Sequence, residues 1–204
     1  MTAGAMLGGV SRETTERLTN YAALLRAWNP KINLVSRQTL ADLEHRHFAD
    51  SAQLLSHAPP GAATWVDLGS GGGFPGLVVA ILAAELRPDL HVTLIESDQR
   101  KAVFLRTVAQ RTGISVTVLA ERIEAVPPLG TDVLSARALA PLAALLDHAE
   151  RHLRPGGTAL FPKGASWRAE LEEALERWRF DCENLSSATS PDGVILKLGE
   201  IARV

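Results

Sequence analysis

The sequence predicts an α/β fold built on a mostly parallel sheet with helices on both faces. From Thr64 onward, short β-branched runs alternate with helical patterns, and a glycine-rich turn follows the first of these runs. Such alternation is typical of βαβ units, whose strands pair in parallel. The tail over 179–201 differs, because its two strand-like runs surround the turn SPDG and leave no room for a crossover helix. We therefore expect seven strands, the last two forming an antiparallel hairpin.

Each predicted element follows from a local pattern. Residues 11–28 place apolar side chains at helical spacing behind Ser11, and residues 39–56 repeat the pattern after a break at Pro30. The predicted strands before the tail are 64–68, 91–96, 115–120, 131–136 and 157–162, and the predicted helices between them are 75–86, 98–112, 141–153 and 166–177. The clearest break is HAPPGAA, so we expect an N-terminal helical cap over 1–60 and a sheet domain over 61–204, packed as one compact unit.

Composition limits the class of protein. A chain of 204 residues with 46% hydrophobic content is long enough for one sizeable core. The single Cys182 cannot form an internal disulfide, residues 1–10 lack the charged segment of a signal peptide, and no apolar run approaches the roughly 20 residues that span a bilayer. We therefore expect a cytoplasmic protein without membrane contact, and a monomer. The net charge of −2 means that nucleic-acid binding would depend on a local basic face.

The stretch VDLGSGGGFPG places a glycine-rich turn between the first strand and the next helix. Such a turn presents backbone N–H groups and the positive end of a helix to a ligand. Gly71, Gly73 and Gly76 satisfy the dinucleotide pattern G-x-G-x-x-G, which is weak evidence alone. Asp67 begins the further spacing D-x-G-x-G-x-G, which includes Gly69, and its carboxylate suits a cationic ligand better than a pyrophosphate. We therefore favour S-adenosylmethionine over NAD, with a purely structural turn as the alternative.

Two further segments lie at the carboxyl ends of predicted strands. Glu96 ends the second strand, where an acidic side chain accepts hydrogen bonds from ribose hydroxyls. NAD enzymes use the same arrangement, so Glu96 supports a nucleoside cofactor without deciding between the two. The segment AERIEAV follows the third strand, and its residues from Arg122 to Glu124 either line an adenine or form an ordinary solvated helix start.

The segment SARALAPL after the fourth strand bears on the methyl acceptor. It lacks the N/D-P-P-Y/F motif that grips an exocyclic amine, and Cys182 is a poor candidate for the nucleophile of pyrimidine carbon methylation. Guanine N7 remains, because it has an exposed lone pair and no proton, and its methylation needs positioning more than acid–base catalysis. The positioning candidates are Arg137, near the cofactor or the guanine O6/N7 edge, and Lys163, near a phosphate or O6. The alternatives are a surface ion pair and a plain exposed lysine.

Basic side chains supply candidates for RNA binding. They are Arg46, His47, Arg100, Lys101, Arg106, Arg111 and Lys163. Arginines on amphipathic helices are also common on solvated faces, which is the alternative interpretation. His45 and His47 have the spacing H-x-H, which points the two rings apart on a helix, so we predict no metal site.

Seven stretches, spread in order over nearly the whole chain, share a pattern with one family. They are WNPKINLVS, HRHFADS, VDLGSGGGFPGLVVAI, IESDQRKAVFLR, ERIEAV, SARALAPL and PKG. Through them the chain resembles the GidB (RsmG) family of 16S ribosomal RNA guanine-N7 methyltransferases. The resemblance implies a Rossmann-like, class I S-adenosylmethionine-dependent methyltransferase fold. It also implies methylation of N7 of one guanine in the decoding-region loop of small-subunit ribosomal RNA, with the RNA or the 30S particle as partner.

The resemblance also implies roles for individual residues. By matching motifs, the residues that contact the cofactor are Gly69, Phe74, Ile123, Glu124 and Arg137, and Glu96 matches the acidic end of the second strand. The C-terminal tail matches poorly and implies no functional assignment. Two alternatives stay open from the residues themselves: a small-molecule or protein methyltransferase on the same fold, and a non-catalytic module that binds nucleotide or RNA.

Overall fold

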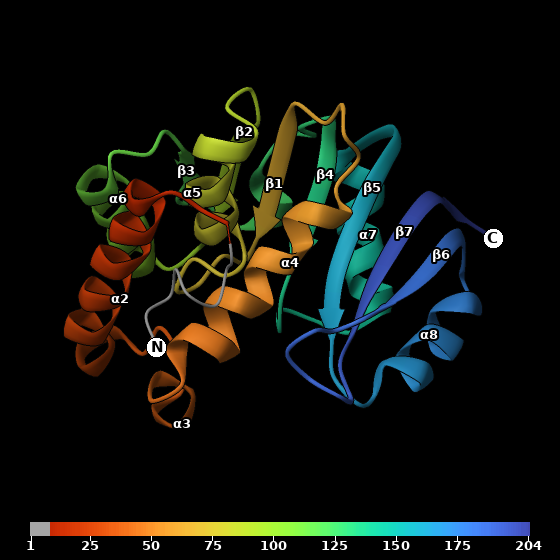
Figure 1. Cartoon of the computed structure of the whole chain (residues 1–204). Helices are drawn as coiled ribbons and strands as arrows, with labels where there is room; N and C mark the ends of the chain where they lie inside the picture. Colours follow the sequence, from red (N-terminus) through yellow and green to blue (C-terminus); the bar gives the residue numbers. More distant parts are fainter. Residues whose placement is uncertain (1–8) are drawn as a thin grey trace.

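The computed structural model describes residues 9–204. Residues 1–8 lie outside this range. They are the start of the predicted N-terminal cap and make up most of the segment 1–10 that we inspected for a signal peptide. Seven strands of the described residues form one sheet in the order β3-β2-β1-β4-β5-β7-β6 (Figure 1). The pairs from β3 to β5 are parallel, whereas β7 is antiparallel to both β5 and β6. The predicted sheet, including its antiparallel last hairpin, is confirmed.

The strands agree with the predicted runs in place, though not always in length. They are β1 (Thr64–Leu68), β2 (His91–Ile95), β3 (Thr117–Leu119), β4 (Thr131–Ala136), β5 (Leu153–Lys163), β6 (Trp178–Ser186) and β7 (Val194–Arg203). Along β1, Trp65 belongs to the apolar core on one face of the sheet and Val66 to the core on the other. This alternation shows that both faces are covered, as parallel sheets require.

Helices supply both covering layers (Figure 1). They are α2 (Arg12–Ile32), α3 (Arg37–Leu40), the π-helical turn η1 (Glu44–Ala49), α4 (Asp50–His57), α5 (Gly76–Leu86), α6 (Gln99–Thr112), the 3-10 turn η2 (Ile123–Ala125), α7 (Leu142–His152) and α8 (Trp167–Leu175). Side chains of α2, α4, α5 and α6 share one core with the sheet, and those of α7 and α8 share the other. The N-terminal helices therefore pack into the same core as the sheet.

The first helix is longer than predicted. Ser11 caps its start, since Ser11 Oγ accepts a hydrogen bond from the Thr14 N–H at 3.2 Å. The predicted end at Pro30 is wrong, because the helix continues to Ile32 and places Pro30 in its last turn. A proline there removes only its own N–H bond. The helix ends where Asn33 adopts a left-handed conformation with φ of 49°.

The predicted second helix over 39–56 is also wrong as a single element. It is divided into α3, η1 and α4. Ser36 starts the first piece early, because its Oγ accepts a hydrogen bond from the Thr39 N–H at 3.2 Å. The π-helical turn then adds a residue per turn, which periodicity at 3.6 residues does not anticipate.

Helix α2 fixes two loops at the carboxyl edge of the sheet. The hydroxyl of the fully buried Tyr21 donates a hydrogen bond to the Gly72 carbonyl oxygen, and its ring stacks on Phe74 with ring centres 5.5 Å apart. Asn29 Oδ1 accepts hydrogen bonds from the backbone N–H groups of Leu34 at 2.8 Å and Val35 at 2.9 Å. The segment NLVS is therefore held beside the glycine loop.

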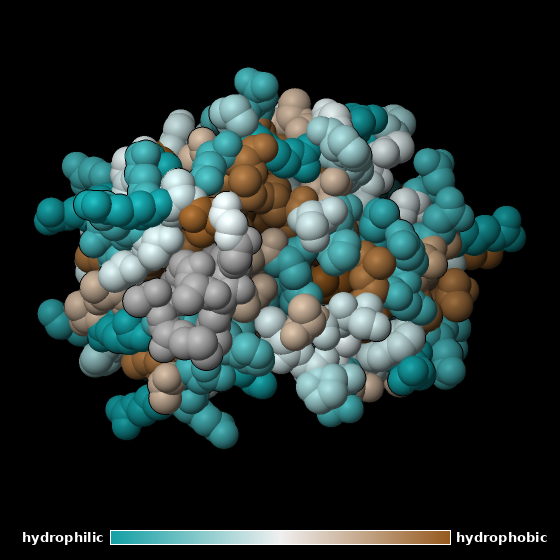
Figure 2. Space-filling view, viewed as in Figure 1, coloured by the Kyte–Doolittle hydropathy of each residue, from teal (hydrophilic) through white to brown (hydrophobic). Residues whose placement is uncertain are grey.

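The surface in Figure 2 is mostly hydrophilic, with apolar side chains gathered in places. One such place is a shallow groove between α4 and α5, where Leu55, Leu82 and Leu86 contribute to the lining. Among residues 9–204, no helix has the length and apolar character needed to cross a membrane.

We predict that Tyr21→Phe lowers the free energy of unfolding by about 1–3 kcal/mol, because the buried Gly72 carbonyl loses its partner. Urea denaturation of the two proteins measures the difference. Substituting the exposed Thr19 of the same helix by alanine should change stability by less than about 0.5 kcal/mol. A Tyr21→Phe variant as stable as the control would mean that the hydroxyl does not hold the loop.

Candidate cofactor and acceptor site

The carboxyl ends of β1, β2 and β4 meet at one edge of the sheet, where parallel α/β folds bind ligands. The chain leaves β1 through the glycine loop and enters α5 at Gly76. Gly69 has φ of 61°, and a β-carbon there would lie 2.6 Å from a Leu139 side-chain carbon. A side chain at this position would be strained by the left-handed backbone and would displace Leu139, so glycine lets the loop pass close to the segment after β4.

A hollow of about 520 Å³ opens at this edge, and we call it the first hollow. Its lining includes most of the residues that the sequence predicted to bind the cofactor: Gly69, Gly71, Phe74, Glu96, Ile123, Glu124 and Arg137. It also includes residues that the prediction did not assign to the cofactor: Leu34, Val35, His47, Ser97, Lys101 and Leu139. The structure therefore brings six separate chain segments to one cavity.

Glu96 is buried at the wall of the first hollow. One carboxylate oxygen accepts a hydrogen bond from the Gly71 N–H and the other from the Asp98 N–H, each at 2.8 Å. Each oxygen has two lone pairs, so both can accept a further hydrogen bond from a ligand. The side chain thus fixes the glycine loop and presents acceptors to the hollow.

Asp67 does not reach the first hollow. The prediction that its carboxylate contacts a cationic ligand is therefore corrected. The residue is fully buried, and its carboxylate accepts hydrogen bonds from Ser135 Oγ at 2.7 Å and the Gly76 N–H at 3.2 Å. It joins β1, β4 and the start of α5. Gly73 likewise lies outside the lining, where a β-carbon would come within 2.5 Å of the Tyr21 hydroxyl oxygen. Asp67 and Gly73 therefore shape the loop from the side that faces away from the first hollow.

Arg137 is held in place by hydrogen bonds to residues of η1 and α4. Its guanidinium donates hydrogen bonds to His47 Nδ1 at 2.6 Å, to an Asp50 carboxylate oxygen at 3.3 Å and to the Arg46 carbonyl oxygen at 3.3 Å. It also lies 5.2 Å from the centre of the Phe74 ring. His47 and Arg46 both belong to the π-helical turn η1, so this turn places two of the acceptors on one guanidinium. Asp50 begins α4, the helix that follows.

His47, one of the predicted RNA-binding candidates, is a buried residue in the wall of the first hollow. It is 7% exposed, and burial, followed by the charges of Arg137 and Arg46, lowers its pKa to about 3. Because arginine can only donate, Nδ1 must be the acceptor, so the neutral ring carries its proton on Nε2. Within the described residues Nε2 is buried and has no partner.

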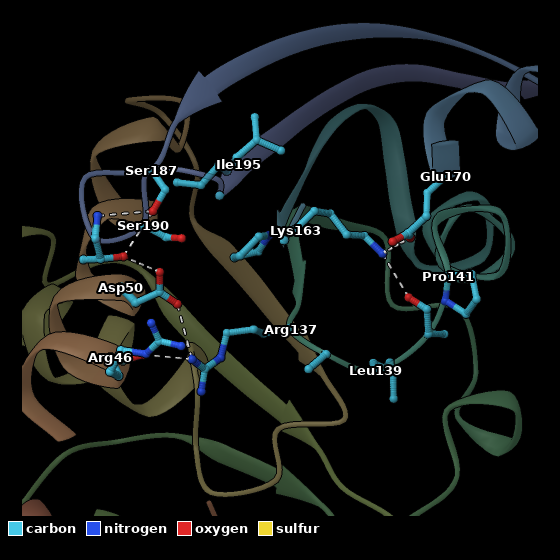
Figure 3. A pocket seen from close by; sticks show the side chains of 17 residues that line it. Arg46, Asp50, Arg137, Leu139, Pro141, Lys163, Glu170, Ser187, Ser190 and Ile195 are labelled. Carbon is cyan, nitrogen blue, oxygen red and sulfur yellow. Dashed lines mark hydrogen bonds and ion pairs between the residues drawn. The ribbon is translucent and has the colours of Figure 1, made fainter. Parts of the chain in front are cut away.

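A second hollow, of about 540 Å³, lies on the other side of the segment after β4, and Figure 3 shows it closely. Arg137, Ala138 and Leu139 line both hollows. Its remaining lining comes from η1, α4, the segment after β4, the end of β5, α8, the loop between β6 and β7 and the start of β7: Arg46, Asp50, Ala140, Pro141, Pro162, Lys163, Gly164, Glu170, Ser187, Thr189, Ser190, Gly193, Val194 and Ile195.

Lys163 is not the plain exposed lysine of the alternative interpretation. Its side chain is 8% exposed, and Nζ donates to a Glu170 carboxylate oxygen at 2.7 Å and to the Ala140 carbonyl oxygen at 3.0 Å. Sequence reasoning missed Glu170, which follows the motif PKG on the next helix and had no signal of its own. It also missed Asp50, although HRHFADS was among the stretches with a family pattern.

The remaining predicted RNA contacts are distributed over both hollows and α6. Arg46 lines the second hollow and Lys101 the first. Arg100 is exposed and pairs with Asp98 at 3.3 Å, and Arg106 donates a hydrogen bond to the Val118 carbonyl oxygen. Cys182 is exposed on β6, outside both hollows. Residues 9–204 contain no group of three or more side chains that could hold a metal ion.

We predict that Asp67→Asn changes how stability depends on pH. Burial raises the pKa of Asp67 from 3.8 to about 6, although hydrogen bonds from Ser135 and Gly76 oppose the shift. The folded protein therefore binds the proton more tightly, and this group's contribution is lost as pH rises from about 4 to about 6. The difference corresponds to about 3 kcal/mol. Urea denaturation at pH 4 and pH 7 should show the variant gaining up to this amount relative to wild type; a constant difference would contradict a raised pKa.

We also predict that the His47 ring stays neutral between pH 8 and pH 5, because its pKa is lowered to about 3. The lowered pKa means that its contribution to stability is lost as pH falls below 6.5 toward 3. Ring carbon and proton shifts in NMR spectra check this directly. The urea-unfolded chain is the reference, in which the same ring should titrate near 6.5. An inflection near 6.5 in the folded protein would rule out the buried, neutral ring.

Comparison with known proteins places these features in a family. The family model GidB, described as rRNA small subunit methyltransferase G, matches residues 14–194. A Ruegeria sp. protein named Ribosomal RNA small subunit methyltransferase G is 56% identical over 195 residues, which cover 96% of this chain and 95% of that relative. A Rhodospirillum centenum protein of the same name is 56% identical over 194 residues, covering 95% of this chain and 88% of that relative.

Solved structures show the same fold at lower identity. A Listeria monocytogenes protein described as a class I S-adenosylmethionine-dependent methyltransferase has a TM-score of 0.63 at 16% identity, covering 94% of this chain and 69% of that one. A ribosomal protein L11 methylase from Lactobacillus delbrueckii subsp. bulgaricus has a TM-score of 0.57 at 20% identity, covering 75% of this chain and 77% of that one. With the predicted fold and the predicted resemblance both confirmed, the chain belongs to the GidB family of ribosomal RNA small subunit methyltransferases.

Proposed function

We propose that this protein transfers a methyl group from S-adenosylmethionine to N7 of one guanine in small-subunit ribosomal RNA. The observation that carries the proposal is the pair of hollows that share Arg137, Ala138 and Leu139 as a common wall. One hollow has the features of a nucleoside cofactor site, and a transfer reaction needs a second ligand directly beside it. The family and the names of the relatives supply the class of substrate.

The first hollow fits S-adenosylmethionine by the chemistry of its walls. Glu96 offers free acceptor positions for the two ribose hydroxyls. Ile123 and Leu139 supply apolar surface for an adenine ring, and Glu124 lies at the same end of the cavity wall. Gly69 and Gly71 leave the loop backbone open to the methionine part. These assignments, like the placement of Arg137 beside the cofactor, rest on lining and chemistry.

The cofactor supplies an electrophilic methyl group, so that the guanine N7 lone pair forms the new N–C bond while the C–S electron pair returns to sulfur. N7 carries no proton, and the protein therefore needs no general base. Arg137 is held by His47, Asp50 and the Arg46 carbonyl, which keeps its guanidinium at the side of the shared wall. In this proposal Arg137 positions the wall between the two ligands.

The proposed RNA contacts are basic side chains of η1 and α6. Arg46, Arg100, Lys101, Arg106 and Arg111 stay in this set, since Arg46 lies on η1 and the other four lie on α6. His47 and Lys163 leave it, because both are buried in hydrogen-bonded positions. The same proposal includes action as a monomer in the cytoplasm on ribosomal RNA, free or assembled in the 30S particle.

Tritium transfer from labelled S-adenosylmethionine to small subunits tests the function. The subunits come from a strain that lacks this protein, and mass spectrometry identifies the modified nucleoside. We expect label at a single 7-methylguanosine. Label on a protein or small molecule, with none on RNA, would instead support the alternative of a small-molecule or protein methyltransferase on the same fold.

Glu96→Gln tests the cofactor site within that function. An amide cannot accept from both the Gly71 and Asp98 N–H groups, so we expect cofactor affinity in calorimetry to fall about tenfold, equivalent to about 1.4 kcal/mol. The matched control is Glu176→Gln at an exposed position after α8. Unchanged affinity in the Glu96 variant, with a normal control, would place the cofactor elsewhere.

A further inference from the structure

We propose that the second hollow binds the acceptor guanine, flipped out of the RNA, and that Glu170 selects it through its 2-amino group. This inference rests on the proposed function and deepens it, because it names the site and the residue that recognise the base. The hollow has a volume of about 540 Å³ and is continuous with the shared wall at Arg137, Ala138 and Leu139. Enzymes that modify a base extrude it into such a pocket.

The shared wall leaves the approach to N7 open. An arginine free to donate to N7 would occupy the lone pair that must attack the methyl group. Here three hydrogen bonds, to His47, Asp50 and the Arg46 carbonyl, direct the Arg137 guanidinium toward the η1 side of the hollow. Figure 3 shows Arg46, Asp50 and Arg137 together on that side. The edge of the base that carries N7 can therefore face Leu139 and the first hollow.

The hollow also offers surfaces for the flat faces of a base. Apolar lining comes from Leu139, Pro141, Pro162, Val194 and Ile195, contributed by the segment after β4 and by β5 and β7. Purine rings are planar and apolar on both faces, so side chains of this type can enclose them. The hydroxyls of Ser187, Thr189 and Ser190 line the same cavity. They come from the loop between β6 and β7, which the sequence left without an assignment.

The wall opposite Arg137 carries a hydrogen-bond acceptor with a free position. In Figure 3, Glu170 and Lys163 lie across the hollow from Arg137. Glu170 Oε2 accepts from Lys163 Nζ and from the Leu142 N–H, which uses both of its lone pairs. Glu170 Oε1 accepts only from Ser166 Oγ among the described residues, at 3.0 Å. One lone pair of Oε1 is therefore available.

This position of Glu170 matches the edge of guanine that points away from N7. The 2-amino group is a donor on that edge, and adenine has none at this position. Partial burial opposes the charge of Glu170, but hydrogen bonds and the Lys163 charge outweigh it and lower its pKa. The group is therefore a carboxylate, which accepts and cannot donate. Lys163 acts here as a positioning residue that aims Glu170, and not as a phosphate ligand.

Charge development gives Glu170 a larger effect during the reaction than in binding. Guanine is neutral before methylation, and its ring system becomes cationic once N7 bonds the methyl group. A hydrogen bond from a cation to a carboxylate is stronger than one from a neutral donor. Because the interaction strengthens toward the transition state, its loss should lower kcat more than it raises KM.

The experiment uses the full chain and small subunits assembled on RNA that carries either guanine or inosine at the methylated position. Inosine keeps N7 and O6 but lacks the 2-amino group. We expect wild-type kcat/KM to fall about tenfold with inosine. We expect Glu170→Gln to lower kcat/KM about tenfold on guanine, mainly through kcat, and to show no further loss on inosine. The matched control, Glu172→Gln at an exposed position of α8, should behave as wild type.

Several results would overturn the inference. An inosine penalty in Glu170→Gln equal to that in wild type would show that Glu170 does not contact the 2-amino group. Equal rates on guanine and inosine in wild type would show that this edge is not recognised, and this arm holds even if the variant fails to fold. Failure of the proposed function is distinguishable, because wild type would then not methylate guanine-containing subunits while still binding the cofactor in calorimetry.

Discussion

The set of hydrogen bonds around Arg137 is the interaction on which the site depends. One guanidinium joins the segment after β4 to η1 and α4, and its position over Phe74 adds the glycine loop. The segment after β4 and the glycine loop are far from η1 and α4 in the sequence, and the His47 and Phe74 rings, with centres 4.7 Å apart, also join η1 to the glycine loop. Because Asp50 supplies the opposing carboxylate and His47 is neutral, the cluster is close to charge balance in a largely buried place. Arg137, Ala138 and Leu139 line both hollows, so this held residue is part of the wall between them.

Behind the site, buried polar groups set the shape of the glycine loop. Asp67, Ser135 and the Gly76 N–H join two strands to the start of α5, and Tyr21 reaches the same loop from the N-terminal helix. Burying a carboxylate is costly, which is why its pKa is raised. Asp67, the residue most typical of the glycine-loop motif in the sequence, therefore affects the cofactor site only by shaping the loop. Glu96, in contrast, presents acceptors to the cavity.

The sheet, its order of elements and most of the first hollow could be predicted from the sequence. Strand runs, glycines and the acidic residue at the end of β2 are local signals, and parallel topology brings them to one edge. The π-helical turn could not be predicted, since its extra residue breaks the periodicity used to read helices. The directions of individual side chains could not be predicted either. Asp67 faces inward, and Lys163 is paired with Glu170 of the next helix. Such pairings depend on tertiary packing across residues that carry no pattern of their own.

We propose that two adjacent ligands, a cofactor and a guanine, lie on opposite sides of the wall formed by Arg137, Ala138 and Leu139. A crystal structure with S-adenosylhomocysteine and 7-methylguanosine monophosphate tests it most directly. We expect the nucleoside of the first ligand beside Glu96 and the methylated base in the second hollow, with its 2-amino group at Glu170. A base bound outside that hollow, or S-adenosylhomocysteine in the hollow that contains Lys163, would contradict this arrangement of the two ligands.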